Sequence, residues 1–243
     1  MPTGTQSNVY GMSHYTTHAS NSKSTCEKVL MACLNGDITL FEYALSDSNE
    51  PKPENNLFRA PYISENSEIV SLDSFTKLSA ATGQSVIVLG ITFINNIGQG
   101  ASGFTAIYTA PLRLETPFYR SMEMVTDKGL PAAMEGIHVR SLMHICSVNW
   151  RIFKHGVSST VFLVSTTCPK VHLFKEKLGK SSESTYKESS VGKYFSELQR
   201  ETESSIYFMD ILYYEDNKYR LTCTGTEQGK ITFFMVDVAE NGE

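Results

Sequence analysis

The sequence has little excess charge and no long apolar segment. Its 243 residues carry a net charge of −5, and no basic stripe runs along any part of the chain. Binding to a phosphate backbone needs such a stripe, so we expect no nucleic-acid partner. No run approaches the roughly 20 apolar residues of a membrane span, and residues 1–26 lack the apolar core of a signal peptide. We therefore expect no signal peptide and no direct membrane insertion.

Cysteine patterns for metal binding or redox chemistry are also lacking. The five cysteines are odd in number and scattered, and none forms a Cys-x-x-Cys pair. The sequence has no Asn-x-Ser/Thr glycosylation site. These features indicate a reducing, cytoplasmic setting and exclude a zinc knuckle. No Gly-x-Ser-x-Gly elbow occurs either. We predict a protein that is not an enzyme, with no catalytic, cofactor-binding or metal-binding residues and no cofactor.

One motif argues superficially for an enzyme. Residues 97–104 read Gly98-x-Gly100-x-x-Gly103, the spacing of a dinucleotide-binding loop. That loop needs a strand before it and a helix after it, so that helix N–H groups meet the pyrophosphate. Residues 86–93 have strand character, but residues 104–109 have it too, and Pro111 discourages a helix. The glycines therefore predict the turn of a β-hairpin.

Other polar residues suggest chemistry at first sight. His14 and His18 have the spacing of a helical metal pair, but their surroundings are not helical and no third ligand follows at a recognisable spacing. His172 alternates with apolar neighbours and is interpreted as an ordinary strand residue. Asp73 and Asp210 stand at matching places in two expected strands and are interpreted as structural groups.

Four hairpins share one layout along the chain. Residues 28–43 and 219–234 are apolar runs around Asn35-Gly36 and Gln228-Gly229, and similar pairs lie at 160–174 and 86–108. The aromatic near the end of each second strand recurs at intervals of 67, 66 and 60 residues. These aromatics are Phe41, Tyr108, Phe174 and Phe234. Three hairpins are preceded by a further candidate strand, at 67–75, 137–148 and 204–216.

Radially repeated antiparallel sheets are typical of a β-propeller. We therefore predict an all-β fold and a single propeller region with about four WD-like blade units. The units are expected at 7–44, 67–110, 137–175 and 204–238, with polar loop inserts at 45–66 and 176–203. Pro51 and Pro53 argue against a regular element in the first insert, and residues 192–201 could form one short helix. An antiparallel β-sandwich is the alternative.

Several segments resemble the kaptin family. They are residues 5–12 (TQSNVYGM), 67–77 (SEIVSLDSFTK), 86–98 (VIVLGITFINNIG), 161–176 (VFLVSTTCPKVHLFKE) and 194–210 (YFSELQRETESSIYFMD). The resemblance implies a scaffold in the KICSTOR complex, which holds the GATOR complex on the lysosomal surface and restrains TOR signalling when amino acids are short. It also implies an alternative, association with actin filaments at the cytoskeleton. It identifies no partner-binding residues, since no motif marks such surfaces on propellers.

Members of that family continue beyond the matched region with further blades, so the resemblance implies an incomplete, open propeller. The last expected strand, at 231–238, has apolar residues on both faces: Ile231, Phe233 and Met235 on one, Phe234 and Val236 on the other. Such a strand needs neighbours on both sides. We expect this strand to self-associate or to pair with a partner propeller.

Overall fold

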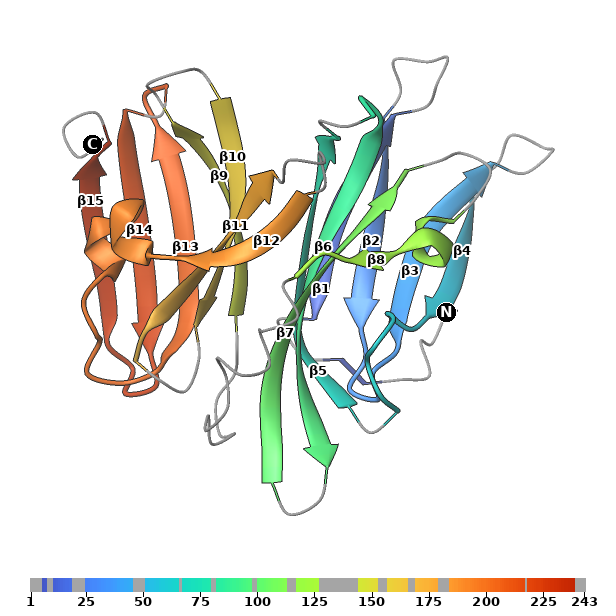
Figure 1. Cartoon of the computed structure of the whole chain (residues 1–243), viewed down its shortest axis with the longest axis horizontal. Helices are drawn as coiled ribbons and strands as arrows, with labels where there is room; N and C mark the ends of the chain where they lie inside the picture. Colours follow the sequence, from blue (N-terminus) through green and yellow to red (C-terminus); the bar gives the residue numbers. More distant parts are fainter. Residues whose placement is uncertain are drawn as a thin grey trace. The chain divides into compact units, whose positions relative to one another are not determined.

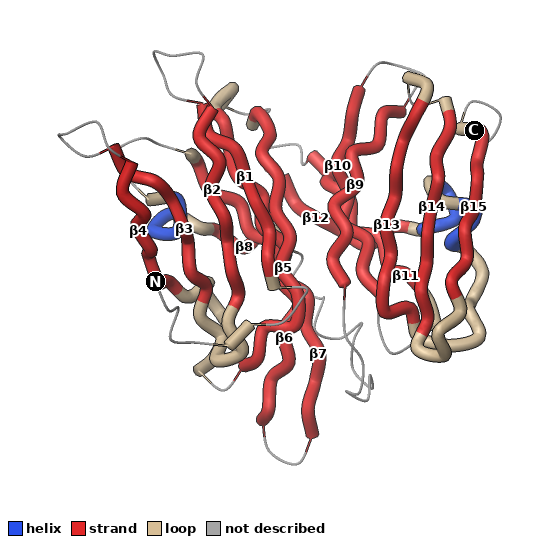
Figure 2. Tube along the Cα trace, turned by 180° about the vertical axis from the view of Figure 1, so that it is seen from behind, coloured by secondary structure: helices blue, strands red, loops and turns tan. Residues whose placement is uncertain are grey.

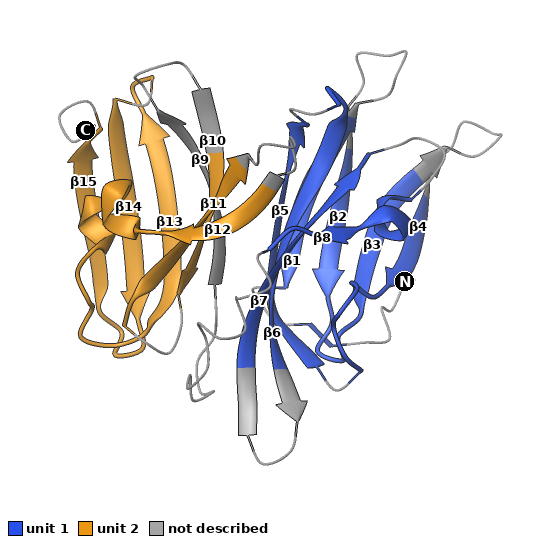
Figure 3. Ribbon diagram, viewed as in Figure 1, with its two compact units in different colours: residues 1–135 blue, residues 136–243 orange. Residues whose placement is uncertain are grey.

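The computed structural model describes residues 6–7, 11–18, 25–45, 51–65, 67–79, 82–97, 100–112, 117–126, 144–152, 157–165, 169–178, 184–216 and 218–238. In these residues the fold is built from β-strands, with three short 3-10 helices and no α-helix (Figure 2). The described part of the chain contains no helix long and apolar enough to span a bilayer. The chain divides into two compact units, residues 1–135 and 136–243 (Figure 3).

The first unit begins with sheet A, an antiparallel meander of four consecutive strands. Its strands are β1 (Met12–His18), β2 (Thr25–Ala32), β3 (Ile38–Leu45) and β4 (Pro51–Phe58), paired in that order (Figure 1). The predicted Asn35-Gly36 turn joins β2 to β3. Gly36 has φ of 84°, a conformation that glycine adopts without steric cost.

Sheet B is a second meander in the same unit. It consists of β5 (Ser67–Leu78), β6 (Ser85–Ile97), β7 (Gly100–Pro111) and β8 (Glu123–Met124), with the 3-10 helix η1 (Phe118–Ser121) before β8. Gly100 and Gly103 lie in β7, where they pair with Ile97 and Ile94. A strand and not a helix therefore follows β6, so the predicted hairpin is confirmed, but Gly100 and Gly103 lie in its second strand and not in the turn.

Sheets A and B share one hydrophobic core. Alternate residues of the strands point into it, including Leu30, Leu40, Leu72 and Leu89. Tyr108 is fully buried there and donates its hydroxyl to the Pro61 carbonyl oxygen at 2.6 Å. Burial raises the pKa of Tyr108 far above its usual range, with a smaller contribution from Tyr62.

The second unit contains sheets C and D. Sheet C comprises β9 (His144–Ile152), β10 (Val157–Ser165), β11 (Val171–Leu178) and β12 (Ser184–Ser189). Two 3-10 helices follow, η2 (Val191–Lys193) and η3 (Ser196–Leu198). Sheet D has three described strands, β13 (Ile206–Tyr214), β14 (Tyr219–Thr226) and β15 (Ile231–Asp237). Val161, Leu173, Phe195 and Met209 belong to the core of this unit.

Four antiparallel sheets follow one another along the chain, as the blade-like repeat predicted. Each sheet is formed by consecutive strands, and the described ladders stay within their own sheet. The four aligned aromatics each lie in the third strand of a sheet, namely β3, β7, β11 and β15. The all-β, four-sheet expectation is therefore confirmed.

The two stretches expected as loop inserts are in part regular structure, so those expectations are wrong in part. Residues 51–58 form β4, and residues 184–189 form β12. Both are edge strands with one described neighbour, which is where proline and polar side chains are tolerated because one side of the backbone needs no ladder partner. The short helix expected within residues 192–201 is replaced by η2 and η3, which are 3-10 turns. Residues 137–143 of the third expected unit lie outside the described residues, and β9 begins at His144.

Candidate interaction surfaces

Of the polar residues that attracted attention in the sequence, His172 and Asp73 have side-chain partners, whereas His14 and His18 are simply spaced along one strand. His14 and His18 lie on the strand β1, which separates them beyond the reach of one metal ion. His172 Nδ1 lies 2.7 Å from Oε1 of Glu188 on the neighbouring strand. Asp73 Oδ1 accepts hydrogen bonds from the Ser13 hydroxyl at 3.1 Å and the Ser74 N–H at 2.8 Å. Among the described residues, no group of three potential ligands could hold a metal ion.

The inner face of sheet D, which points toward sheet C of the same unit, carries a buried and hydrogen-bonded ion pair. Arg220 and Glu197 form a bidentate ion pair at 2.7 and 2.8 Å, with only 3% and 4% of their side chains exposed. The Arg220 guanidinium also donates to the Tyr194 carbonyl oxygen at 3.1 Å and lies 4.4 Å from the centre of the Phe195 ring. Thr222 donates its hydroxyl to Glu197 at 2.8 Å. These contacts fasten the η2–η3 segment to sheet D.

The outer face of sheet D is open and apolar. Cross-strand register arranges it in three rows across β13, β14 and β15. The rows are Phe208–Gly225–Ile231, Asp210–Cys223–Phe233 and Leu212–Leu221–Met235. Ile231, Phe233 and Met235 are 65–70% exposed. An apolar face of this kind marks an interaction surface.

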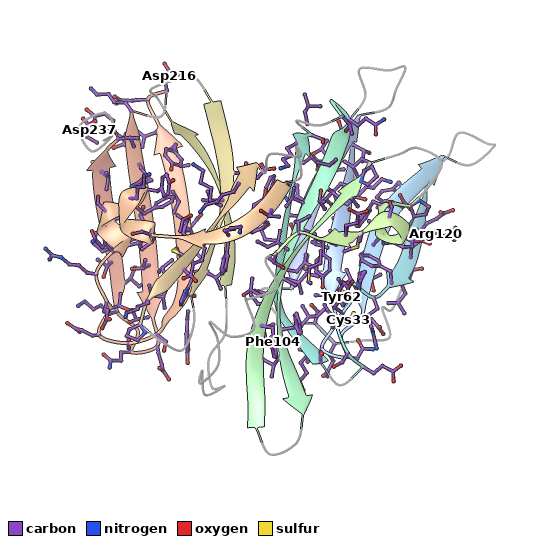
Figure 4. All side chains as sticks on the ribbon, in the orientation of Figure 1. Cys33, Tyr62, Phe104, Arg120, Asp216 and Asp237 are labelled. Atoms are coloured by element: carbon purple, nitrogen blue, oxygen red, sulfur yellow. The ribbon has the colours of Figure 1, made fainter. Side chains whose placement is uncertain are left out.

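The end of this face carries aromatic and charged groups. Tyr214 and Tyr219 stack with ring centres 5.3 Å apart, and the Tyr214 hydroxyl donates to the Met235 sulfur at 3.2 Å. Asp216, in the β13–β14 turn, and Asp237, at the end of β15, lie at this same end of the sheet (Figure 4). The outer face of sheet D is thus an apolar surface with a polar end, the usual anatomy of a protein contact.

The strand β15 also has an edge with no neighbour among the described strands. The Thr226 N–H donates to the Lys230 carbonyl oxygen, and the Val238 N–H donates to the Lys218 carbonyl oxygen. These bonds show which residue pairs of the β14–β15 ladder are hydrogen-bonded. Hydrogen-bonded and non-hydrogen-bonded pairs alternate in an antiparallel ladder. The backbone groups of Ile231, Phe233 and Met235 therefore point away from β14, toward this edge.

Sheet A has a second open face, on the side away from sheet B. Register places Met12, Met31, Thr39 and Leu57 in one row, and His14, Val29, Phe41 and Asn55 in the next. Met12 and Leu57 are exposed, as is Tyr43 at the far end of β3. This face was not predicted from the sequence. No pattern within a single strand indicates it, because the face is assembled from four strands by their pairing register.

The sequence did predict the two faces of the last strand. The structure places Ile231, Phe233 and Met235 on the exposed face, while Val236, on the opposite face, is buried. Position by position, Phe233 corresponds to Leu40 of sheet A and Leu173 of sheet C, because each directly precedes an aligned aromatic. Leu40 and Leu173 are buried in the cores of their own units, whereas Phe233 is 66% exposed. The outer face of sheet D is therefore a core-type face without a neighbouring sheet among the described residues.

Comparison with known proteins identifies the family. The family described as KICSTOR complex protein kaptin matches residues 1–242. The mouse protein named KICSTOR complex protein kaptin is 29% identical over 233 residues, which cover 96% of this chain and 48% of the mouse protein. The chain thus spans about half the length of that relative. Because the family match extends over nearly every residue, the chain belongs to the KICSTOR complex protein kaptin family.

Proposed function

We propose that this chain is a non-enzymatic scaffold subunit of a KICSTOR-type complex. The observation that carries the proposal is the family match over residues 1–242, together with the printed name of the mouse relative as a KICSTOR complex protein. Two open apolar sheet faces fit a protein that works by assembling with others. In this role the chain recruits GATOR to the lysosomal surface and restrains TOR signalling when amino acids are scarce.

Affinity purification tests this role. A tagged version of the chain is recovered from amino-acid-starved cells, beside tagged full-length mouse kaptin as the positive control. We expect subunits of KICSTOR and GATOR with both baits. If the full-length control recovers them and this chain recovers none, the scaffold role is wrong for this chain.

Actin-filament association at the cytoskeleton is the alternative raised by the family resemblance. Co-sedimentation of the purified chain with filaments separates it from the scaffold role. A chain that pellets with filaments at micromolar concentration, and recovers no KICSTOR subunit, would favour the alternative.

A further inference from the structure

We propose that the outer face of sheet D binds the outer face of sheet A of a second copy of this chain. The contact is head to tail, so each copy offers one face of each kind. This inference goes beyond the proposed function and does not depend on it.

Within each unit, one sheet packs face to face on the other. Sheet A covers sheet B, and sheet C covers sheet D, through rows of apolar side chains. An antiparallel sheet is therefore the element that covers a sheet face in this fold. In the described strands, most of the exposed large apolar side chains lie on these two outer faces: Met12, Tyr43 and Leu57 on sheet A, and Phe208, Leu212, Ile231, Phe233 and Met235 on sheet D. A second copy supplies a matching sheet for each.

Cross-strand register identifies equivalent positions in the sheets. In each sheet, the cross-strand row that contains the aligned aromatic of the third strand also contains one residue of the first strand, and in sheet C that row is Ser147–Phe162–Phe174. In sheets A, B and D the rows are His14–Val29–Phe41, Ser74–Leu89–Tyr108 and Ile211–Thr222–Phe234. The residues one position earlier, on the opposite face, are Ser13, Asp73 and Asp210. His14 is therefore equivalent to Ser74, and Asp210 is equivalent to Ser13.

These equivalences predict a specific polar contact. Between sheets A and B, Ser13 Oγ lies 2.8 Å from Ser74 Oγ, and the Ser74 N–H donates to Ser13 Oγ at 2.9 Å. If sheet D packs on sheet A of a second copy as sheet A packs on sheet B, the equivalent pair is Asp210 with His14. Both side chains are exposed. An imidazole is a suitable donor for a carboxylate, and more so when protonated.

The same pair argues against the competing contact between two copies of the outer face of sheet D. That contact would bury two Asp210 carboxylates at the centre of one interface, and like charges in a desolvated contact are unfavourable. The head-to-tail contact places each carboxylate near His14 instead. Charge therefore favours the outer face of sheet A as the occupant.

Sedimentation velocity and light scattering on the purified chain test the proposal. We expect a mass above that of the monomer at micromolar concentration, as a ring or an open chain of copies. Phe233→Asp alters one face and Met12→Glu alters the other, and each should weaken association by about thirtyfold or more, as expected of interface anchors. Leu78→Asp, at an exposed apolar residue of sheet B, is the matched control and should associate like the unaltered chain.

Mixing the variants identifies the contact. The Phe233→Asp chain retains its sheet A face, and the Met12→Glu chain retains its sheet D face. Each should be monomeric alone, and an equimolar mixture should form a dimer with one intact contact. His14→Glu and Asp210→Lys should each weaken association, and the double variant should restore it.

Three results would overturn the proposal. The unaltered chain could be monomeric throughout the micromolar range. Met12→Glu could leave association intact while Phe233→Asp abolishes it, which would indicate pairing between two sheet D faces. Finally, the mixture could remain monomeric, which would show that the two altered faces do not meet.

Discussion

Removing the buried carboxylate of Glu197 should destabilise the second unit strongly. The Arg220 side chain is only 3% exposed, and Glu197→Ala leaves its guanidinium buried without the paired carboxylate. The change also removes the acceptor of the Thr222 hydroxyl. Loss of one partner of a buried pair costs about 3–5 kcal/mol, because the remaining charge stays desolvated. The Phe195 ring and the Tyr194 carbonyl oxygen compensate only part of that charge.

Urea denaturation, followed by the fluorescence of the single tryptophan, Trp150 in β9, measures this loss in the unit that contains the pair. Glu201→Ala is the control, since Glu201 and Lys170 pair at 2.8 Å with about 60% of each side chain exposed. An exposed pair contributes about 0–1 kcal/mol. If the unfolding free energies of Glu197→Ala and Glu201→Ala differ by less than about 1 kcal/mol, the reasoning about burial is refuted.

Other changes test the turns and the core. Gly36→Ala should lower the unfolding free energy more than Gly229→Ala. Both glycines have positive φ, which costs any other residue about 1–2 kcal/mol of strain. Only at Gly36, however, would the new Cβ also lie 2.9 Å from the Ser67 carbonyl oxygen. Equal losses in urea titrations would contradict the close approach. Burial raises the pKa of Tyr108 and Tyr186, so both stay protonated in the folded state while the unfolded chain loses its protons above pH 10. The stability that these two groups contribute is complete below pH 10 and declines as the pH rises above it. We therefore expect a lower urea midpoint at pH 11 than at pH 9. This decrease should be smaller in the Tyr108→Phe variant. An unchanged pH dependence in that variant would exclude Tyr108 as a cause.

Sequence patterns predicted those elements in which local chemistry decides the structure. Asn35-Gly36 and Gln228-Gly229 marked hairpins because glycine there adopts positive φ. The strand β4 was missed because Pro51 and Pro53 weaken local strand propensity, and only its place at the edge of sheet A makes them acceptable. The strand β12 was missed for a related reason, since its polar composition is typical of a loop.

The candidate surfaces were predictable to different degrees. The two faces of β15 could be read from alternation within one strand. The outer face of sheet A could not, because it is assembled from four strands whose register depends on tertiary pairing. The buried Arg220–Glu197 pair also escaped prediction, since a charged residue in a polar segment ordinarily lies in solvent.

The consecutive order of strands in each sheet has a consequence for synthesis on the ribosome. Sheet A is complete in sequence at Phe58, but the core that Leu30 and Leu40 share with sheet B includes residues of β7, which ends at Pro111. At about 5–20 residues per second, that interval lasts on the order of 3–10 s, far longer than hairpin formation. During it the nascent chain presents a formed sheet whose apolar core face is only partly covered, and this is the interval in which a chaperone that binds apolar surface would be needed.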